Sequence, residues 1–253
     1  MMRGMPGAAA IEVASSSFAV AVSAGVVAGL VRGFSGFGSA LVLAPALSAL
    51  YGPATAVPAA LLMELALAVP FVPPALRRVE FRQLGVLALG ALATVPLGAW
   101  LLLAIDPQLI RWAISGLVLT LVAIVAFGWR YHGRPTAVAT AVTGALSGML
   151  NGATGLAGPP VIFYYLSGVD SAERMRASFI VFFSWVDLLA IVSYAAADTL
   201  TGVTATLALW LAIPYVAGAA AGARLFREAS EQLYRRVGLA VLTAVAVVSL
   251  PFE

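Results

Sequence analysis

Apolar residues follow one another in long runs along almost the whole chain, separated by short polar or glycine-rich breaks. A helix needs about 20 apolar residues to cross the hydrocarbon core of a bilayer. Read against this length, the runs predict helices over 17–31, 38–51, 55–74, 83–104, 109–128, 135–150, 156–168, 177–197, 203–223 and 235–250. Four of these are too short for a full crossing. They predict two hairpins, 17–51 and 135–168, each made of two short helices around a glycine-rich break.

The composition places the chain in a membrane. Hydrophobic residues make up 62% of the sequence and charged residues only 10%, whereas a soluble domain carries about 25% charged residues. The 24 glycines and 14 prolines are tolerated in membrane helices, where neighbouring segments satisfy the freed backbone groups. We therefore expect an all-α integral membrane protein.

Several residue types are missing, and this narrows the chemistry. The sequence has no cysteine, its 14 basic residues are all arginine, and its one histidine is His132 in a predicted loop. Disulfides, iron–sulfur clusters and thiolate metal sites are excluded, and a histidine-rich metal centre is disfavoured. We find no nucleophile with a base at suitable spacing and no nucleotide-binding motif. We expect no cofactor, no metal, no nucleotide and no enzymatic activity, and the arginines between apolar runs do not indicate nucleic acid.

A repeat divides the chain into residues 1–129 and 130–253. Two sets of glycines have the same spacing at an offset of 119 residues: Gly25, Gly29, Gly33 and Gly36, then Gly144, Gly148, Gly152 and Gly155. Two further pairs have similar offsets, 118 for Pro96 and Pro214 and 123 for Glu64 and Asp187. Four-residue glycine spacing is also typical of close helix packing, which is the alternative interpretation. The first run also loosely resembles a signal peptide cleaved after residue 24, but its recurrence favours a helix.

Arginine positions predict the orientation of the helices. Four loops that fall on one side hold eleven of the 14 arginines, so that side is expected to be cytoplasmic. Each hairpin enters and leaves on one side, and three crossings follow it. Because three is odd, the second repeat is inverted relative to the first. Inverted repeats with interrupted helices are typical of secondary transporters, and the interruptions mark the binding site.

The two interruptions, 32–39 and 151–160, carry the candidate anion-binding residues. A short helix restarts after each break, and its first N–H groups and dipole favour an anion. Arg32, equivalent to Asn151 by the repeat, supplies the full charge. The predicted substrate-binding residues are Arg32, Ser35, Gly36, Gly38, Ser39, Asn151, Thr154, Gly155 and Gly158. The alternatives are an Arg32 side chain that reaches back to the membrane interface, and a glycine cluster that serves packing alone.

Glu64 and Asp187 lie near the centres of the crossings that follow each hairpin. A carboxylate there is costly, so such residues face a cavity, pair with another group or carry protons. Both are candidates for ion coupling; the alternative is a structural pair with Arg32 or with the broken-helix backbone. Phe182 and Trp185, within a turn of Asp187, are candidates for lining the cavity, with plain aromatic packing as the alternative.

Two segments resemble the paired glycine-rich signatures of the sulfite exporter TauE/SafE family, also described as toluene sulfonate uptake permeases. They are 33–39, Gly-Phe-Ser-Gly-Phe-Gly-Ser, with Pro45 downstream, and 148–162, Gly-Met-Leu-Asn-Gly-Ala-Thr-Gly-Leu-Ala-Gly-Pro-Pro-Val-Ile. The resemblance extends over nearly the whole chain. It departs at Ser39 and Ala40, where many members carry consecutive glycines. It implies a multi-pass carrier of the bacterial inner membrane for sulfite, sulfonates or related organosulfur anions.

The hypothesis from the sequence is a secondary transporter, an exporter of sulfite or a small organosulfonate, with the anion at midplane between the hairpin tips. An anion channel with the same paired hairpins is the alternative, and a membrane enzyme or assembly subunit is a third class. The expected partners are a small sulfur-containing anion and the lipid bilayer. The identity of the anion, the direction, the coupling ion and a homo-oligomeric state stay open.

Overall fold

The computed structural model describes residues 16–126, 136–166 and 172–228, and every regular element in these ranges is a helix. The helices are α1 (Ser16–Ser35), α2 (Ser39–Tyr51), α3 (Pro53–Leu76), α4 (Phe81–Ala104), α5 (Pro107–Ala126), α6 (Ala137–Thr154), α7 (Gly158–Leu166), α8 (Ala172–Ala196) and α9 (Gly202–Glu228). The all-helical prediction is confirmed for this part of the chain. The predicted helix over 235–250 lies outside the described residues, as do His132 and the loop that contains it.

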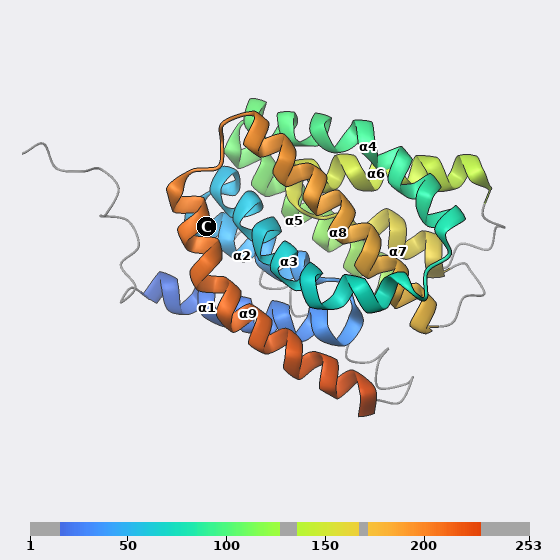
Figure 1. Cartoon of the computed structure of the whole chain (residues 1–253). Coiled ribbons are helices and arrows are strands. Elements are labelled where there is room, and N and C mark those ends of the chain that lie inside the picture. The colour runs from blue at the N-terminus through green and yellow to red at the C-terminus, as the bar shows by residue number, and fades with distance from the viewer. Residues whose placement is uncertain (1–15, 127–135, 167–171, 229–253) are drawn as a thin grey trace, which may run out of the picture.

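Two long helix pairs enclose a central pair. Helix α4 packs along α6, and α1 packs along α9, in the two most extensive interfaces between helices. In Figure 1 these pairs lie on opposite sides of the molecule, with α3 and α8 between them. Helices α3 and α8 pack against each other and are antiparallel, because Arg78 after the end of α3 pairs with Glu173 at the start of α8 (3.8 Å). Each long pair joins a helix of one predicted repeat to a helix of the other.

Glycines allow both long pairs to approach closely. A Cβ atom at Gly29 would lie 2.9 Å from the backbone nitrogen of Ala219 in α9, and one at Gly148 would lie 2.8 Å from the Cα atom of Ala91 in α4. Real side chains do not fit at these distances. The close-packing interpretation is therefore confirmed at Gly29 and Gly148, whereas a Cβ at Gly25 would lie 3.7 Å from the Leu211 carbonyl oxygen, an ordinary contact.

The same contacts correct one detail of the repeat. Gly29 lies against Tyr215 and Gly148 against Ala91. Ala91 and Tyr215 thus occupy matching positions in the two helix pairs, and they are 124 residues apart in the sequence. Pro96 and Pro214, 118 residues apart, do not hold matching places in these two pairs, and a proline kink can sit at different points of two helices.

The two interruptions lie later than the sequence indicated. The predicted breaks cover 32–39 and 151–160, but α1 continues to Ser35 and α6 to Thr154, so Gly33 and Gly152 are still helical. The backbone turns at glycines with positive φ, which are Gly36 (80°), Gly38 (89°) and Gly155 (74°). Only glycine adopts this conformation without strain. The helical glycines before each turn, Gly33 and Gly152, face the neighbouring helix, where the absence of a Cβ atom allows close packing.

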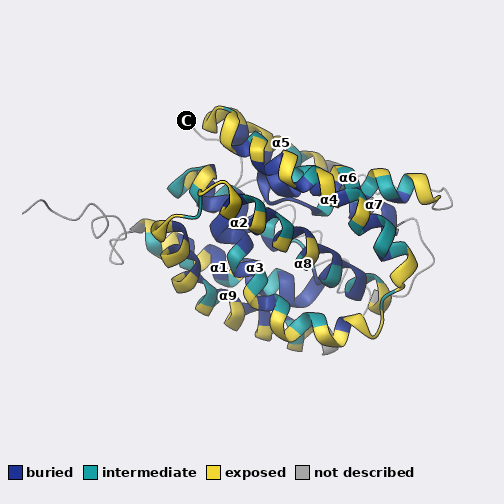
Figure 2. Cartoon of the chain, turned by 45° about the horizontal axis from the view of Figure 1, so that its top comes forward, coloured by how far each residue is buried: buried dark blue, intermediate teal, exposed yellow. Residues whose placement is uncertain are grey.

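Five helices in the described part are long and apolar enough to cross a membrane: α1, α3, α4, α8 and α9. Their outer faces expose large apolar side chains, among them Leu89 (71% exposed) and Trp100 (61%) in α4. Figure 2 shows exposed residues along the outer faces of the helices and buried residues within. An apolar exterior of this kind suits lipid, so the protein is a multi-pass membrane protein.

Candidate functional site

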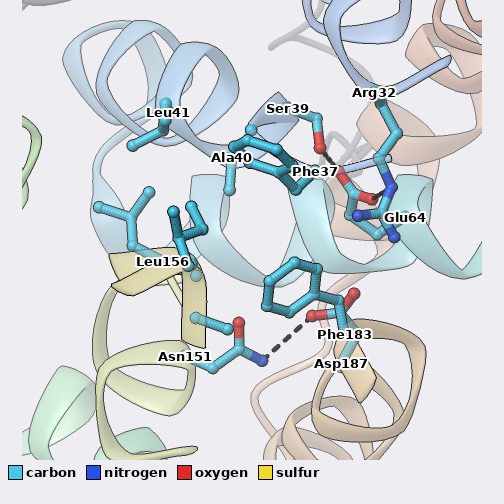
Figure 3. A pocket seen from close by; sticks show the side chains of 15 residues that line it. Arg32, Phe37, Ser39, Ala40, Leu41, Glu64, Asn151, Leu156, Phe183 and Asp187 are labelled. Atoms are coloured by element: carbon cyan, nitrogen blue, oxygen red, sulfur yellow. Dashed lines mark hydrogen bonds and ion pairs between the residues drawn. The ribbon is translucent and has the colours of Figure 1, made fainter. Parts of the chain in front are cut away.

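The two helix breaks meet at one cavity of about 40 Å³, room for a few waters or a small anion. The lining comes from the segment around the break between α1 and α2, from the break between α6 and α7, and from α3 and α8 (Figure 3). The residues that line it are Arg32, Phe37, Gly38, Ser39, Ala40, Leu41, Glu64, Asn151, Gly155, Leu156, Ala157, Gly158, Ile162, Phe183 and Asp187. The first turns of α2 and α7 both contribute, so helix N-termini border the cavity as predicted.

Arg32 lies in the last turn of α1 and is only 7% exposed. Its Nε lies 3.1 Å from Oε2 of Glu64, and its Nη1 donates to the carbonyl oxygen of Gly36 at 2.8 Å. Its guanidinium carbon lies 5.7 Å from the centre of the Phe183 ring. A cation suits this place because a helix C-terminus carries partial negative charge. Arg32 does not reach out to the membrane interface, so that alternative is wrong.

Glu64 receives two hydroxyl groups besides the guanidinium. Tyr215 in α9 donates to Oε1 at 2.6 Å, and Ser39 at the start of α2 donates to the same oxygen. Glu64 is 5% exposed. Charge-assisted hydrogen bonds of this kind stabilise a buried carboxylate. The pairing of Glu64 with Arg32, one of the two interpretations from the sequence, is observed.

Asp187 has a different partner. Asn151, in the last turn of α6, donates its amide to Oδ1 of Asp187 at 3.1 Å. Both side chains are buried, at 1% and 4% exposed, and Figure 3 shows them on the side of the cavity away from Ser39. Among the described residues Asp187 forms no ion pair, so its nearest polar partner is neutral.

Six of the nine predicted binding residues line the cavity: Arg32, Gly38, Ser39, Asn151, Gly155 and Gly158. The other three, Ser35, Gly36 and Thr154, shape the breaks. Ser35 Oγ donates to the Val31 carbonyl (2.7 Å), and Thr154 Oγ1 donates to the Leu150 carbonyl (2.7 Å). Each also accepts a backbone N–H two residues ahead. Local bonds of this kind favour the end of a helix, so these hydroxyls stabilise the turns.

The aromatic residues next to Asp187 are placed differently from the prediction. Phe183 lines the cavity, whereas Phe182 is fully buried outside its lining. Trp185 is 38% exposed, and its indole nitrogen donates to the carbonyl of Ala88 in α4 at 3.4 Å. Successive residues of a helix are rotated by about 100°, so Phe182, Phe183 and Trp185 point in different directions. The packing interpretation therefore holds for Phe182 and Trp185.

Sequence reasoning missed two residues that hold Arg32 and Glu64 in place. Tyr215 donates to Glu64, and Phe183 faces the Arg32 guanidinium. Tyr215 lies in the middle of an apolar run, where a buried hydroxyl needs a partner. The sequence therefore indicated that Tyr215 needs a partner. It did not identify Glu64 as that partner, because the two residues are 151 positions apart.

A second, smaller cavity of about 10 Å³ lies on another side of Arg32. It is lined by Arg32, Leu67, Phe71, Ile180 and Ser184, so it runs between α3 and α8. Leu67 and Phe71 follow Glu64 along α3, and Ile180 precedes Asp187 along α8. This cavity therefore lies toward the end of the molecule that carries Arg78 and Glu173. Arg32 borders both cavities.

Comparison with known families decides the classification. The sequence model of the sulfite exporter TauE/SafE family matches residues 21–249, most of the chain. The chain belongs to this family. The TauE/SafE match extends over both helix breaks and both buried carboxylates, and it confirms the resemblance seen in the glycine-rich segments. No curated protein and no solved structure matches the chain.

Membership of TauE/SafE agrees with the fold. The family is one of membrane transporters, and the five apolar helices identify a multi-pass membrane protein. A sulfite or anion transporter is consistent with a cavity that is bordered by a buried arginine and by two helix N-termini.

Proposed function

We propose that this protein is a secondary transporter that exports sulfite or a small organosulfonate across the bacterial inner membrane. The anion binds at midplane in the cavity between the two helix breaks. One observation carries the proposal: two segments far apart in the sequence each break a membrane helix, and both breaks border the same cavity beside Arg32. Irregular backbone at membrane depth is tolerated where it lines a cavity.

The chemistry of the lining suits an oxyanion. Arg32 brings a full positive charge, Asn151 brings an amide, and Ser39 brings a hydroxyl group. The helix starts at Ser39 and Gly158 add backbone N–H groups and the positive ends of two helix dipoles. A sulfonate or sulfite group has three oxygens that accept from such donors. In the present conformation Arg32 and Ser39 bond Glu64, so an anion would compete with this carboxylate for them.

An inverted repeat is part of the proposal, with residues 1–129 and 130–253 as its halves. The interfaces support it, since α1 with α9 and α6 with α4 are the same pair under exchange of the halves. The buried contacts support it as well. Arg32 meets Glu64 and Asn151 meets Asp187, and the residues at each end are repeat equivalents.

Alternating access would move the halves, or the hairpins, around a fixed site. The two cavities on either side of Arg32 support this, because a small shift of α3 against α8 would join the smaller one to the central cavity. The smaller cavity lies toward the end that arginine counting assigns to the cytoplasm.

The test is anion exchange in proteoliposomes, with sulfite, sulfoacetate, another organosulfonate and thiosulfate as substrates. We expect saturable uptake that is accelerated by unlabelled anion inside, and a loss of about tenfold or more in Asn151→Ala. Leu146→Ala, on the exposed face of the same helix, is the matched control and should transport normally. Flux that does not saturate and shows no acceleration by internal anion would favour an anion channel instead. No flux of any sulfur anion by folded protein would overturn the proposal.

A further inference from the structure

The side chains around the cavity include more carboxylates than cations, which is unfavourable for binding an anion. Among the described residues that line it, Arg32 is the one cation, and Glu64 and Asp187 are the carboxylates. Arg32 and Glu64 form an ion pair, with both side chains less than a tenth exposed. This pair is neutral as a unit. Asp187, if ionised, therefore leaves the empty cavity with a net charge of one negative, before an anion arrives.

The two carboxylates are held in different ways. Glu64 accepts from Tyr215 and Ser39 and pairs with Arg32, so three donors stabilise its ionised form. Asp187 accepts from the neutral amide of Asn151. A carboxylate with several donors and a cation keeps its charge, whereas one with a single neutral donor in a buried place does so at a cost.

The groups that face Asp187 come from each helix near it. Helix α3 contributes Glu64, and α6 contributes Asn151. Arg32 from α1 is already paired with Glu64, and Tyr215 from α9 is bonded to the same residue. The described parts of α4 and α7 bring no ionisable side chain into the lining of the cavity. Among these groups, no cation is left unshared to pair with Asp187.

We propose that Asp187 binds one proton together with each transported anion, while Glu64 remains the fixed counter-ion of Arg32. This rests on the proposed transport function and deepens it. Without the proton, Asp187 and the anion would place two like charges in a small buried cavity, where water screens them poorly. With it, a monoanion leaves the cavity neutral. The proton adds to one carboxylate oxygen of Asp187 and leaves from it on the other side of the membrane, so no other bond changes.

This arrangement fixes the sign of the coupling. The proton and the anion favour each other's binding, and they therefore cross in the same direction. An antiporter would need an anion that displaces the proton, and repulsion between two negative charges works against that. Acid on one side of the membrane should drive the anion away from that side. Net export then requires an outward anion gradient larger than the opposing proton gradient.

The first experiment counts protons in the native, full-length protein in detergent. Methanesulfonate and isethionate are the probes, because each carries a single negative charge that is constant near neutral pH. We expect the weakly buffered solution to lose about one proton for each anion bound, as read with a pH indicator. Anion binding without proton uptake, or with proton release, would overturn the inference while leaving the transport proposal intact.

The second experiment measures the pH dependence of exchange in proteoliposomes. For the native protein, acid outside should accelerate uptake of the monoanion methanesulfonate, and acid inside should slow it. One proton per monoanion allows about tenfold accumulation for each unit of pH difference. In Asp187→Asn the ratio of uptake with and without the gradient should fall to one, whatever the absolute rate. Asp106→Asn, at the exposed start of α5, is the control and should keep the native ratio.

The outcomes separate the two proposals. Absence of exchange with every sulfur anion by folded native protein contradicts the transport function itself. Exchange that ignores the gradient in the native protein, or responds with the opposite sign, contradicts the role of Asp187 alone. A native ratio that persists in Asp187→Asn does the same. If this variant fails to fold, the proton count in the native protein still decides.

Discussion

Asn151 donates its side-chain amide to Asp187 at 3.1 Å, whereas Arg32 lies 3.1 Å from Glu64 in an ion pair. One buried carboxylate therefore has a cation as its partner, and the other has a neutral amide. In the proposed repeat Arg32 corresponds to Asn151, so the two halves would differ in charge at this position. Among the lining residues that the structure describes, Arg32 is the one cation, and it pairs with Glu64 and not with Asp187.

The ion pair between Arg32 and Glu64 predicts that stability and transport can be separated. Arg32→Ala leaves a buried carboxylate without its cation, which should cost about 3–5 kcal/mol of stability. The double variant Arg32→Gln with Glu64→Gln removes both charges, so most of that stability should return while anion exchange stays lost. Thermal unfolding in detergent and proteoliposome exchange are the two measurements.

The matched control for this pair is Arg82→Ala, because Arg82 is an exposed arginine at the start of α4. It should change neither stability nor exchange. Near-native exchange in the double variant would show that Arg32 serves structure alone and would remove it from the binding site.

Tyr215 predicts a second effect on Glu64. Tyr215→Phe keeps the buried ring and removes the hydroxyl group that donates to Oε1. Hydrogen bonds to charged groups contribute about 1.5–3 kcal/mol, so the unfolding midpoint should fall. Tyr51→Phe, at the half-buried end of α2, should leave it nearly unchanged. Equal midpoints for the two variants would contradict the role of the Tyr215 hydroxyl.

The close approach of α1 to α9 predicts a sharp difference between two glycines. A Cβ at Gly29 would lie 2.9 Å from the Ala219 nitrogen, whereas one at Gly85 in α4 has nothing within 4 Å. Gly29→Ala should therefore lose about 1–3 kcal/mol through overpacking. Gly85→Ala should gain up to about 1 kcal/mol, because alanine favours a helix over glycine. Thermal unfolding of the purified variants gives the comparison, and an unchanged Gly29→Ala would mean that the two helices separate easily.

Much of the site was visible in the sequence because polar residues are rare within the apolar runs. Arg32, Glu64, Asn151 and Asp187 all stand out for this reason, and all four line the cavity. Ser35 and Thr154, also predicted as ligands, do not line the cavity. Their hydroxyls bond carbonyls four residues earlier on the same helix, an option open to any such residue near a helix end. Composition does not distinguish this local bond from a bond to a ligand.

By itself, the sequence determined that this is a helical membrane protein with two glycine-rich interruptions and a few buried charges. These properties follow from local hydrophobicity and from the conformational freedom of glycine, which each residue carries wherever it lies. Only the tertiary structure decided that Arg32 pairs with Glu64, that Tyr215 joins them, and that Asp187 receives a neutral amide. These contacts join residues 32 to 151 positions apart, and the angles and offsets at which helices cross determine them.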